Sequence, residues 1–121
     1  MIRRQLINFQ NRSVDVRVGL GAFDELSRMF ASAVGKPKRA MVVWNSASSE
    51  RFDEVVEHAL VDAGFAVSQF SLEVSPAGAT LADADAIFGA LSANGITCDD
   101  LVVAVGDAAT CSVVSWCANQ W

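Results

Sequence analysis

Apolar and polar residues alternate in different rhythms along the chain, and these rhythms predict strands and helices in turn. Residues 14–18 alternate strictly between apolar and polar, which is typical of a half-buried strand, and residues 66–72 alternate again. Residues 40–44 and 101–105 are continuous apolar runs, which predict strands buried on both faces of a sheet. The pattern therefore predicts four strands.

Helical spacing of apolar residues fills the intervals between these strands. Gly64 is placed to end the clearest of the helices, and Thr80 is placed to cap the start of the next one. The last helix carries Trp116 and Trp121, whose large apolar side chains are expected to pack on a partner surface. The predicted helical segments are residues 23–33, 52–63, 81–91 and 108–121.

Strands that alternate with helices predict βαβ units and a parallel sheet. Short connections and right-handed crossovers favour a three-layer, Rossmann-like α/β sandwich, formed by one domain over residues 1–121. Ligands bind such sheets at the carboxyl ends of the strands. The candidate binding loops are therefore residues 45–49, 74–79 and 106–112.

Composition narrows the classes of partner. Nine Lys and Arg residues against fourteen Asp and Glu residues give a formal net charge of −5, which removes the usual electrostatic basis for binding nucleic acid or an anionic membrane surface. No apolar run approaches the roughly 18–20 residues that span a bilayer, and polar residues interrupt the N-terminus where a signal peptide would be apolar. The clustered basic residues are expected on solvated faces. They are Arg3, Arg4, Arg12 and Arg17, and Lys36, Lys38 and Arg39.

The cysteines and the single histidine do not indicate a metal, redox or catalytic site. Cys98, Cys111 and Cys117 match neither a zinc motif nor a C-x-x-C redox pair, which favours reduced, buried thiols in a cytoplasmic protein. Cys111 follows a predicted helix start, a position that can lower a thiol pKa, but without a partner base a structural thiol is the simpler interpretation. His58 lies off its helix's apolar stripe and is expected at the surface. No residue is assigned as catalytic or as a metal ligand.

Two stretches of the chain resemble the 3-dehydroquinate synthase family. Residues 14–26, VDVRVGLGAFDEL, resemble the strand and glycine turn with which these enzymes open. Residues 95–106, GITCDDLVVAVG, are similar to the family segment GltRdDlvvAlGGG. The resemblance covers essentially the whole chain, which corresponds to the N-terminal third of a synthase.

This resemblance implies the NAD-binding domain of an enzyme of the shikimate pathway, which leads to the aromatic amino acids. Family members use NAD and a divalent metal, usually zinc, to convert a seven-carbon phosphorylated keto acid into 3-dehydroquinate with loss of phosphate. The metal ligands of the family lie in a helical C-terminal domain outside the part that this chain resembles. The chain alone is therefore expected to be inactive, and to pair with a second copy or with that missing domain through its apolar C-terminal surface.

The chain departs from the family at three cofactor motifs. The family's D-x-N reads NSA at residues 45–47, its E-x-x-K reads PAGA at residues 76–79, and its G-G-G-V-x-x-D reads GDAATCS at residues 106–112. Asp107 would set a negative charge beside a pyrophosphate, and it is also a suitable helix N-cap. The cofactor-binding residues that the resemblance implies are Asn45, Gly106, Asp107 and Ser112.

Three interpretations of the function stay open. The chain is the NAD-binding domain of a synthase homologue, or a non-catalytic remnant or protein-interaction domain that has lost NAD, or a domain of a related polyol or iron-type alcohol dehydrogenase. Residues 95–106 favour the synthase over the dehydrogenases. At single positions the plainer alternatives are a loop asparagine at Asn45 and a strand-to-helix turn glycine at Gly106.

Overall fold

The computed structural model describes residues 2–10, 12–33, 39–46 and 52–121. Five strands and four α-helices, with one short 3-10 helix, make up this part of the chain. In chain order they are β1 (Arg3–Phe9), β2 (Arg12–Val18), η1 (Ala22–Glu25), α1 (Leu26–Ala33), β3 (Arg39–Asn45), α2 (Phe52–Asp62), β4 (Ala66–Leu72), α3 (Leu81–Ala93), β5 (Leu101–Val105) and α4 (Ala108–Gln120).

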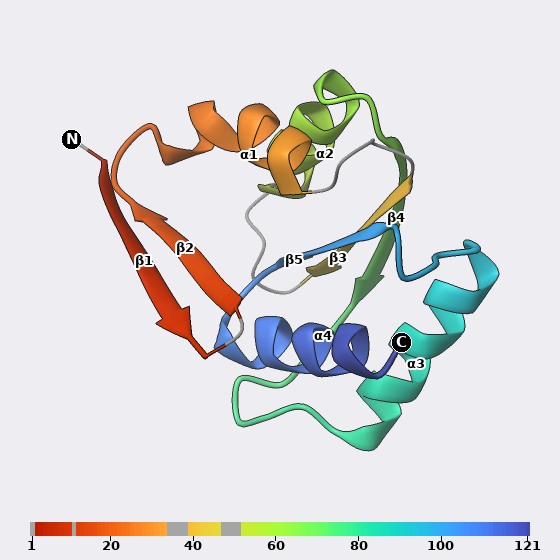
Figure 1. The fold of residues 1–121 in the computed structure, drawn as a ribbon. Coiled ribbons are helices and arrows are strands. Elements are labelled where there is room, and N and C mark those ends of the chain that lie inside the picture. Colours follow the sequence, from red (N-terminus) through yellow and green to blue (C-terminus); the bar gives the residue numbers. More distant parts are fainter. Residues whose placement is uncertain (1, 11, 34–38, 47–51) are drawn as a thin grey trace.

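A parallel sheet in the order β4-β3-β5 forms the middle layer. Helices α1 and α2 cover one face of this sheet, and α3 and α4 cover the other (Figure 1). The described part of the chain is therefore a three-layer α/β structure, as its alternation of strands and helices predicts. The three parallel strands place their carboxyl ends along one edge of this sheet, where ligands bind in such folds.

Strand β3 supplies side chains to both halves of the core. Ala40 and Val42 point into a cluster with Leu60 of α2, whereas Met41 and Val43 point into a cluster with α3 and α4. This alternation follows from the period of two in a strand, and the burial of nearly every position explains the unbroken apolar run. The predicted central strand is confirmed.

The second continuous apolar run is less buried than its sequence predicts. Four of the five residues of β5 are only partly buried, and Val105 alone is fully buried. The side chains of β5 pack on both core clusters, as expected, but the expected full burial is wrong, because β5 is an edge strand of the sheet that the structure describes. An apolar run predicts a strand but does not distinguish a central from an edge position.

A second sheet was not predicted from the sequence. Residues 14–18 are in a strand, as expected, but β2 pairs antiparallel with β1 and does not join the parallel sheet. Figure 1 shows this hairpin beside the main sheet, below α1. One of its faces carries Ile7, Phe9, Val14 and Val18, all exposed. Alternation predicts a strand with one apolar face, and it leaves the pairing partner undetermined.

Helix boundaries agree well with their sequence signals. Thr80 and Asp83 form a capping box at the start of α3, because each side chain bonds the other's backbone N–H. Gly64 follows α2 with a φ of 96°, a conformation that favours glycine at a helix end. Both predicted helix boundaries are confirmed.

Candidate functional site

Buried polar side chains join the strand ends at the carboxyl edge of the sheet. Asn45 is the last residue of β3 and is 1% exposed. Its side-chain nitrogen donates a hydrogen bond to the carbonyl of Val74, at 3.2 Å, and another to Oγ1 of Thr110, at 3.0 Å. The carboxamide of Asn45 thus links β3 to the loop after β4 and to the first turn of α4, and faces the protein interior.

Thr110 continues this hydrogen-bonded series to Asp107. The threonine is fully buried, and its hydroxyl donates to Oδ1 of Asp107 at 2.8 Å, while its backbone N–H donates to the same oxygen at 3.0 Å. Asp107 is therefore the N-cap of α4, as its position predicts. We call this series, Asn45 to Thr110 to Asp107, the polar chain.

Thr110 is the one member of the polar chain that was not predicted from the sequence. Its signal is local: it stands three residues after an aspartate at a helix start, where an N-cap side chain reaches a backbone N–H. The link from Thr110 back to Asn45 spans 65 residues and depends on the tertiary fold. No local sequence pattern predicts this hydrogen bond between Asn45 and Thr110.

Gly106 makes room for the polar chain. A Cβ atom at this position would lie 3.0 Å from both Cβ and Oγ1 of Thr110 and 3.1 Å from its Cγ2. Contacts in this range are tighter than nine in ten real Cβ contacts, so Thr110 would have to shift by a few tenths of an ångström. The packing of Thr110 accounts for a glycine at this turn without any ligand.

Ser112, the fourth predicted residue, lies apart from the polar chain. It lines a hollow of about 310 Å³ between the start of α3 and α4, which we call the α3–α4 hollow. Neither Asn45 nor Asp107 lines this space. The structure therefore brings Asn45, Gly106 and Asp107 together and separates Ser112 from them. The residues around the hollow include Ala79, Leu81, Ala84, Ser112, Val113 and Trp116.

The groups at this edge do not fit a dinucleotide. The side-chain nitrogen of Asn45 donates both of its hydrogens, to Val74 and to Thr110, so it has none left to donate to a ribose hydroxyl. The Asp107 carboxylate already accepts the backbone N–H of Thr110 at the N-terminus of α4, where a pyrophosphate would otherwise bind, and its charge would repel that group. Within residues 2–10, 12–33, 39–46 and 52–121 no group of His, Cys, Asp and Glu could hold a metal ion either.

Electrostatics confirm the structural role of Asp107. The hydrogen bonds from the backbone and the hydroxyl of Thr110 lower the pKa of this carboxyl below its ordinary value. Because the pKa is lowered in the folded state, the carboxylate stabilises the fold above pH 3.8, and this contribution is lost as the pH falls through the lowered value.

We expect Asp107→Ala to lower the urea midpoint of unfolding at pH 7, because α4 loses its cap. The difference from the unchanged protein should shrink steadily as the pH falls below 3.8, where the native carboxyl also becomes neutral. Asp85→Ala, at an exposed position of α3, is the matched control and should leave the midpoint nearly unchanged. An equal effect of the two changes at pH 7 would contradict the capping role.

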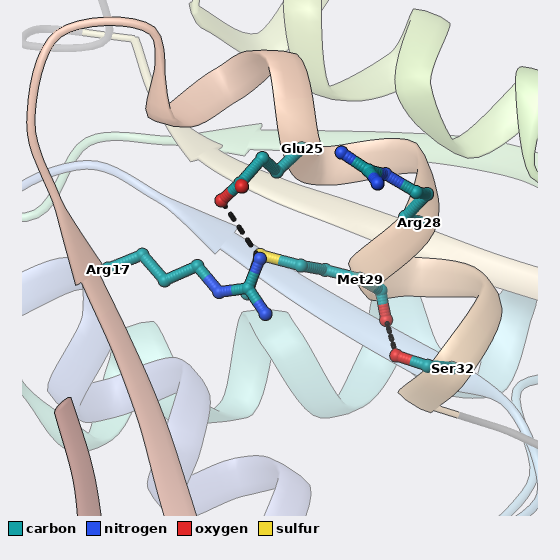
Figure 2. Close-up of a pocket in the computed structure, with 5 residues that line it drawn as sticks. All are labelled: Arg17, Glu25, Arg28, Met29 and Ser32. Carbon is teal, nitrogen blue, oxygen red and sulfur yellow. Dashed lines mark hydrogen bonds and ion pairs between the residues drawn. The ribbon is translucent and has the colours of Figure 1, made fainter. Parts of the chain in front are cut away.

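A second hollow, of about 240 Å³, lies between β2 and α1 (Figure 2). Figure 2 shows Arg17 reaching from β2 toward Met29, with its guanidinium bonded to Glu25 at 2.9 Å. Arg17 also pairs with Asp15 at 3.2 Å, and the hydrogen bonds from Arg17 and then Arg4 lower the pKa of Asp15. Two carboxylates therefore neutralise Arg17, whereas Arg28, which also lines this hollow, makes no ion pair with any residue that the structure describes.

The basic residues thus differ in part from the solvated faces that the sequence predicts. The side chain of Arg17 is only 20% exposed, because Asp15 and Glu25 hold it against the hairpin and η1. Arg39 is exposed and donates to the carbonyl of Gly95 at 2.9 Å. Lys36 and Lys38 lie outside the described residues, as do residues 47–49 of the first candidate loop.

The cysteines are unpaired, but they are not all buried. Cys117 is buried and Cys111 partly so, whereas Cys98 is exposed, in the turn before β5. Burial raises the pKa of the Cys111 thiol, and the nearby charge of Asp107 raises it further. A reactive, low-pKa thiol at this helix start is therefore contradicted, because the capping carboxylate opposes a thiolate. His58 is exposed, as predicted.

Neither the models of known protein families nor the curated proteins include a match to this chain. Among the helices that the structure describes, none is both long and apolar enough to cross a membrane.

Proposed function

We propose that this chain is the nucleotide-binding-type domain of a 3-dehydroquinate synthase-like protein, with no catalytic activity of its own. One observation carries the proposal: the segment GITCDDLVVAVG, which resembles the family most closely, occupies the turn before β5, the strand itself and the glycine at its carboxyl end. A Rossmann-like parallel sheet with helices on both faces agrees with that assignment. The unpaired cysteines support a cytoplasmic location.

A second function, that of an interaction domain that no longer binds NAD, is favoured by the polar chain. Asn45, Thr110 and Asp107 satisfy one another at the edge where a dinucleotide would bind. The domain would then act by contact with another protein surface, either a second copy or a catalytic domain. The aromatic side chains of Trp116 and Trp121, about half exposed on α4, support such contact. Activity and zinc would belong to that other domain.

Titration with NAD separates the two functions. If the chain no longer binds NAD, as the engaged donors of Asn45 and the charge of Asp107 favour, its 1H–15N spectrum should not change at millimolar NAD and constant ionic strength. Saturable shifts confined to residues 46, 74–79 and 106–112 would instead mean that the edge still takes the cofactor. In that case the interaction domain is excluded, and supplying a synthase catalytic domain should restore activity.

A further inference from the structure

The α3–α4 hollow has apolar walls that are open to solvent. Leu81 is 82% exposed and Trp116 is 49% exposed, although both are large apolar side chains. Ala84 and Val113, which also line the hollow, are buried. Of the described residues, none that lines it carries a charge. An uncharged recess with exposed apolar rims favours ligands that bury apolar surface.

One polar group in this hollow is free to bond a ligand. The hydroxyl of Thr80 is engaged in the capping box, since it bonds both the backbone and the carboxylate of Asp83. Ser112 differs: its hydroxyl makes no hydrogen bond to any residue that the structure describes. A ligand in the hollow would therefore meet apolar walls and a single hydroxyl that can donate or accept.

Trp116 adds an aromatic surface whose position is fixed. Its ring lies 6.1 Å from that of Phe88, at an interplanar angle of 59°, and Phe88 in turn stacks on Trp121 at 6.0 Å. Such tilted and stacked contacts orient aromatic rings. Trp116 is thus held at the rim of the hollow, while about half of its surface remains available for a further ring.

We propose that the α3–α4 hollow binds a small, uncharged aromatic compound, which packs on Trp116 and Leu81 and bonds the hydroxyl of Ser112. The volume of about 310 Å³ lies at the lower end for small-molecule sites, so a single fused two-ring system suits it. A charged ligand would find no counter-charge in the lining, and the net charge of −5 disfavours anions further. The site does not depend on the polar chain, which lies outside the hollow.

Indole, a neutral two-ring compound, is the probe for this site. We expect saturable millimolar binding, with 1H–15N shifts confined to the backbone of Leu81, Ala84 and Ser112 and to the indole N–H of Trp116. Leu81→Asp should weaken binding about fivefold or more, because it removes apolar contact and adds a charge at the rim. Leu20→Asp is the matched control, since Leu20 is 95% exposed in the turn after β2, and it should leave the affinity unchanged.

Four results would overturn the proposal. Shifts spread over the exposed apolar face of the hairpin would mean non-specific adsorption. Equal affinities for the Leu81→Asp and Leu20→Asp variants would place indole elsewhere. Shifts of the same residues on dilution, without indole, would mean that a second copy of the chain covers the hollow. Indole-2-carboxylate should bind more weakly than indole, and equal or tighter binding would contradict an uncharged ligand. NAD binding is scored at residues 106–111, none of which lines the hollow, so the two proposals can fail independently.

Discussion

Asn45→Asp is expected to destabilise the protein by about 3 kcal/mol or more at pH 7. The substitution keeps the shape of the side chain but replaces a buried donor by a carboxylate. The carbonyl of Val74 loses its hydrogen bond, and a second negative charge joins the polar chain, separated from Asp107 by Thr110 alone. Urea unfolding followed by far-UV circular dichroism measures the loss.

The loss of stability caused by Asn45→Asp should depend on pH. Burial beside Asp107 should raise the pKa of the new carboxyl in the folded state above its ordinary value of about 3.9. The penalty is then largest at neutral pH and decreases in acid, where the carboxyl is neutral in both states. Stability should be compared with the unchanged protein at each pH, so that the weakening of the Asp107 cap cancels.

Asn8→Asp is the control for the charge change, because Asn8 is exposed on β1. It should alter stability by less than about 0.5 kcal/mol. If Asn45→Asp unfolds the chain entirely at pH 7, Asn45→Ala provides a second test, with an expected loss of about 2 kcal/mol. An Asn45→Asp variant as stable as the unchanged protein would show that the polar chain contributes nothing to the fold.

Gly106→Ala is expected to cost about 1–3 kcal/mol, because the added Cβ lies only 3.0 Å from the buried Thr110 and the φ of 158° strains a side chain. Thr110 is fully buried and bonded on two sides, to Asn45 and to Asp107, so it has little freedom to move aside. Thermal unfolding measures the effect, at roughly 4 °C of Tm for each kcal/mol.

Gly89→Ala is the matched control for this substitution. Gly89 lies within α3, and a Cβ there would meet no atom within 4 Å. Alanine at an open helical position should raise the Tm, by up to about 1 kcal/mol in stability, since glycine disfavours the helix. If both alanines had the same effect, Gly106 would not be required for the packing of Thr110.

Local signals in the sequence predict local structure well in this chain. The capping box at Thr80, the glycine after α2 and the N-cap at Asp107 each depend on residues within a few positions, and all three are present. Strand β4 begins and ends where its alternation does. These features were predictable because neighbouring residues alone determine them.

Features that depend on contacts between distant segments were not predictable. Strand β1 mixes charged, amide and apolar residues without a strict period, and its pairing with β2 fixes it as a strand. The position of Asn45 at a strand end followed from the pattern, whereas the inward direction of its side chain depends on Val74 and Thr110. The candidate site could therefore be located in the sequence, but its internal bonding could not be foreseen.

The β1–β2 hairpin lies apart from the core and contains no tryptophan, and this affects how its unfolding can be detected. Among the residues that the structure describes, neither core cluster contains a member of β1 or β2. Opening this two-stranded sheet would leave both clusters intact, so it can separate from the rest in a sub-global step of low free energy. All three tryptophans, Trp44, Trp116 and Trp121, lie outside the hairpin. Tryptophan fluorescence therefore reports unfolding of the main sheet and its helices, and it does not detect opening of the hairpin.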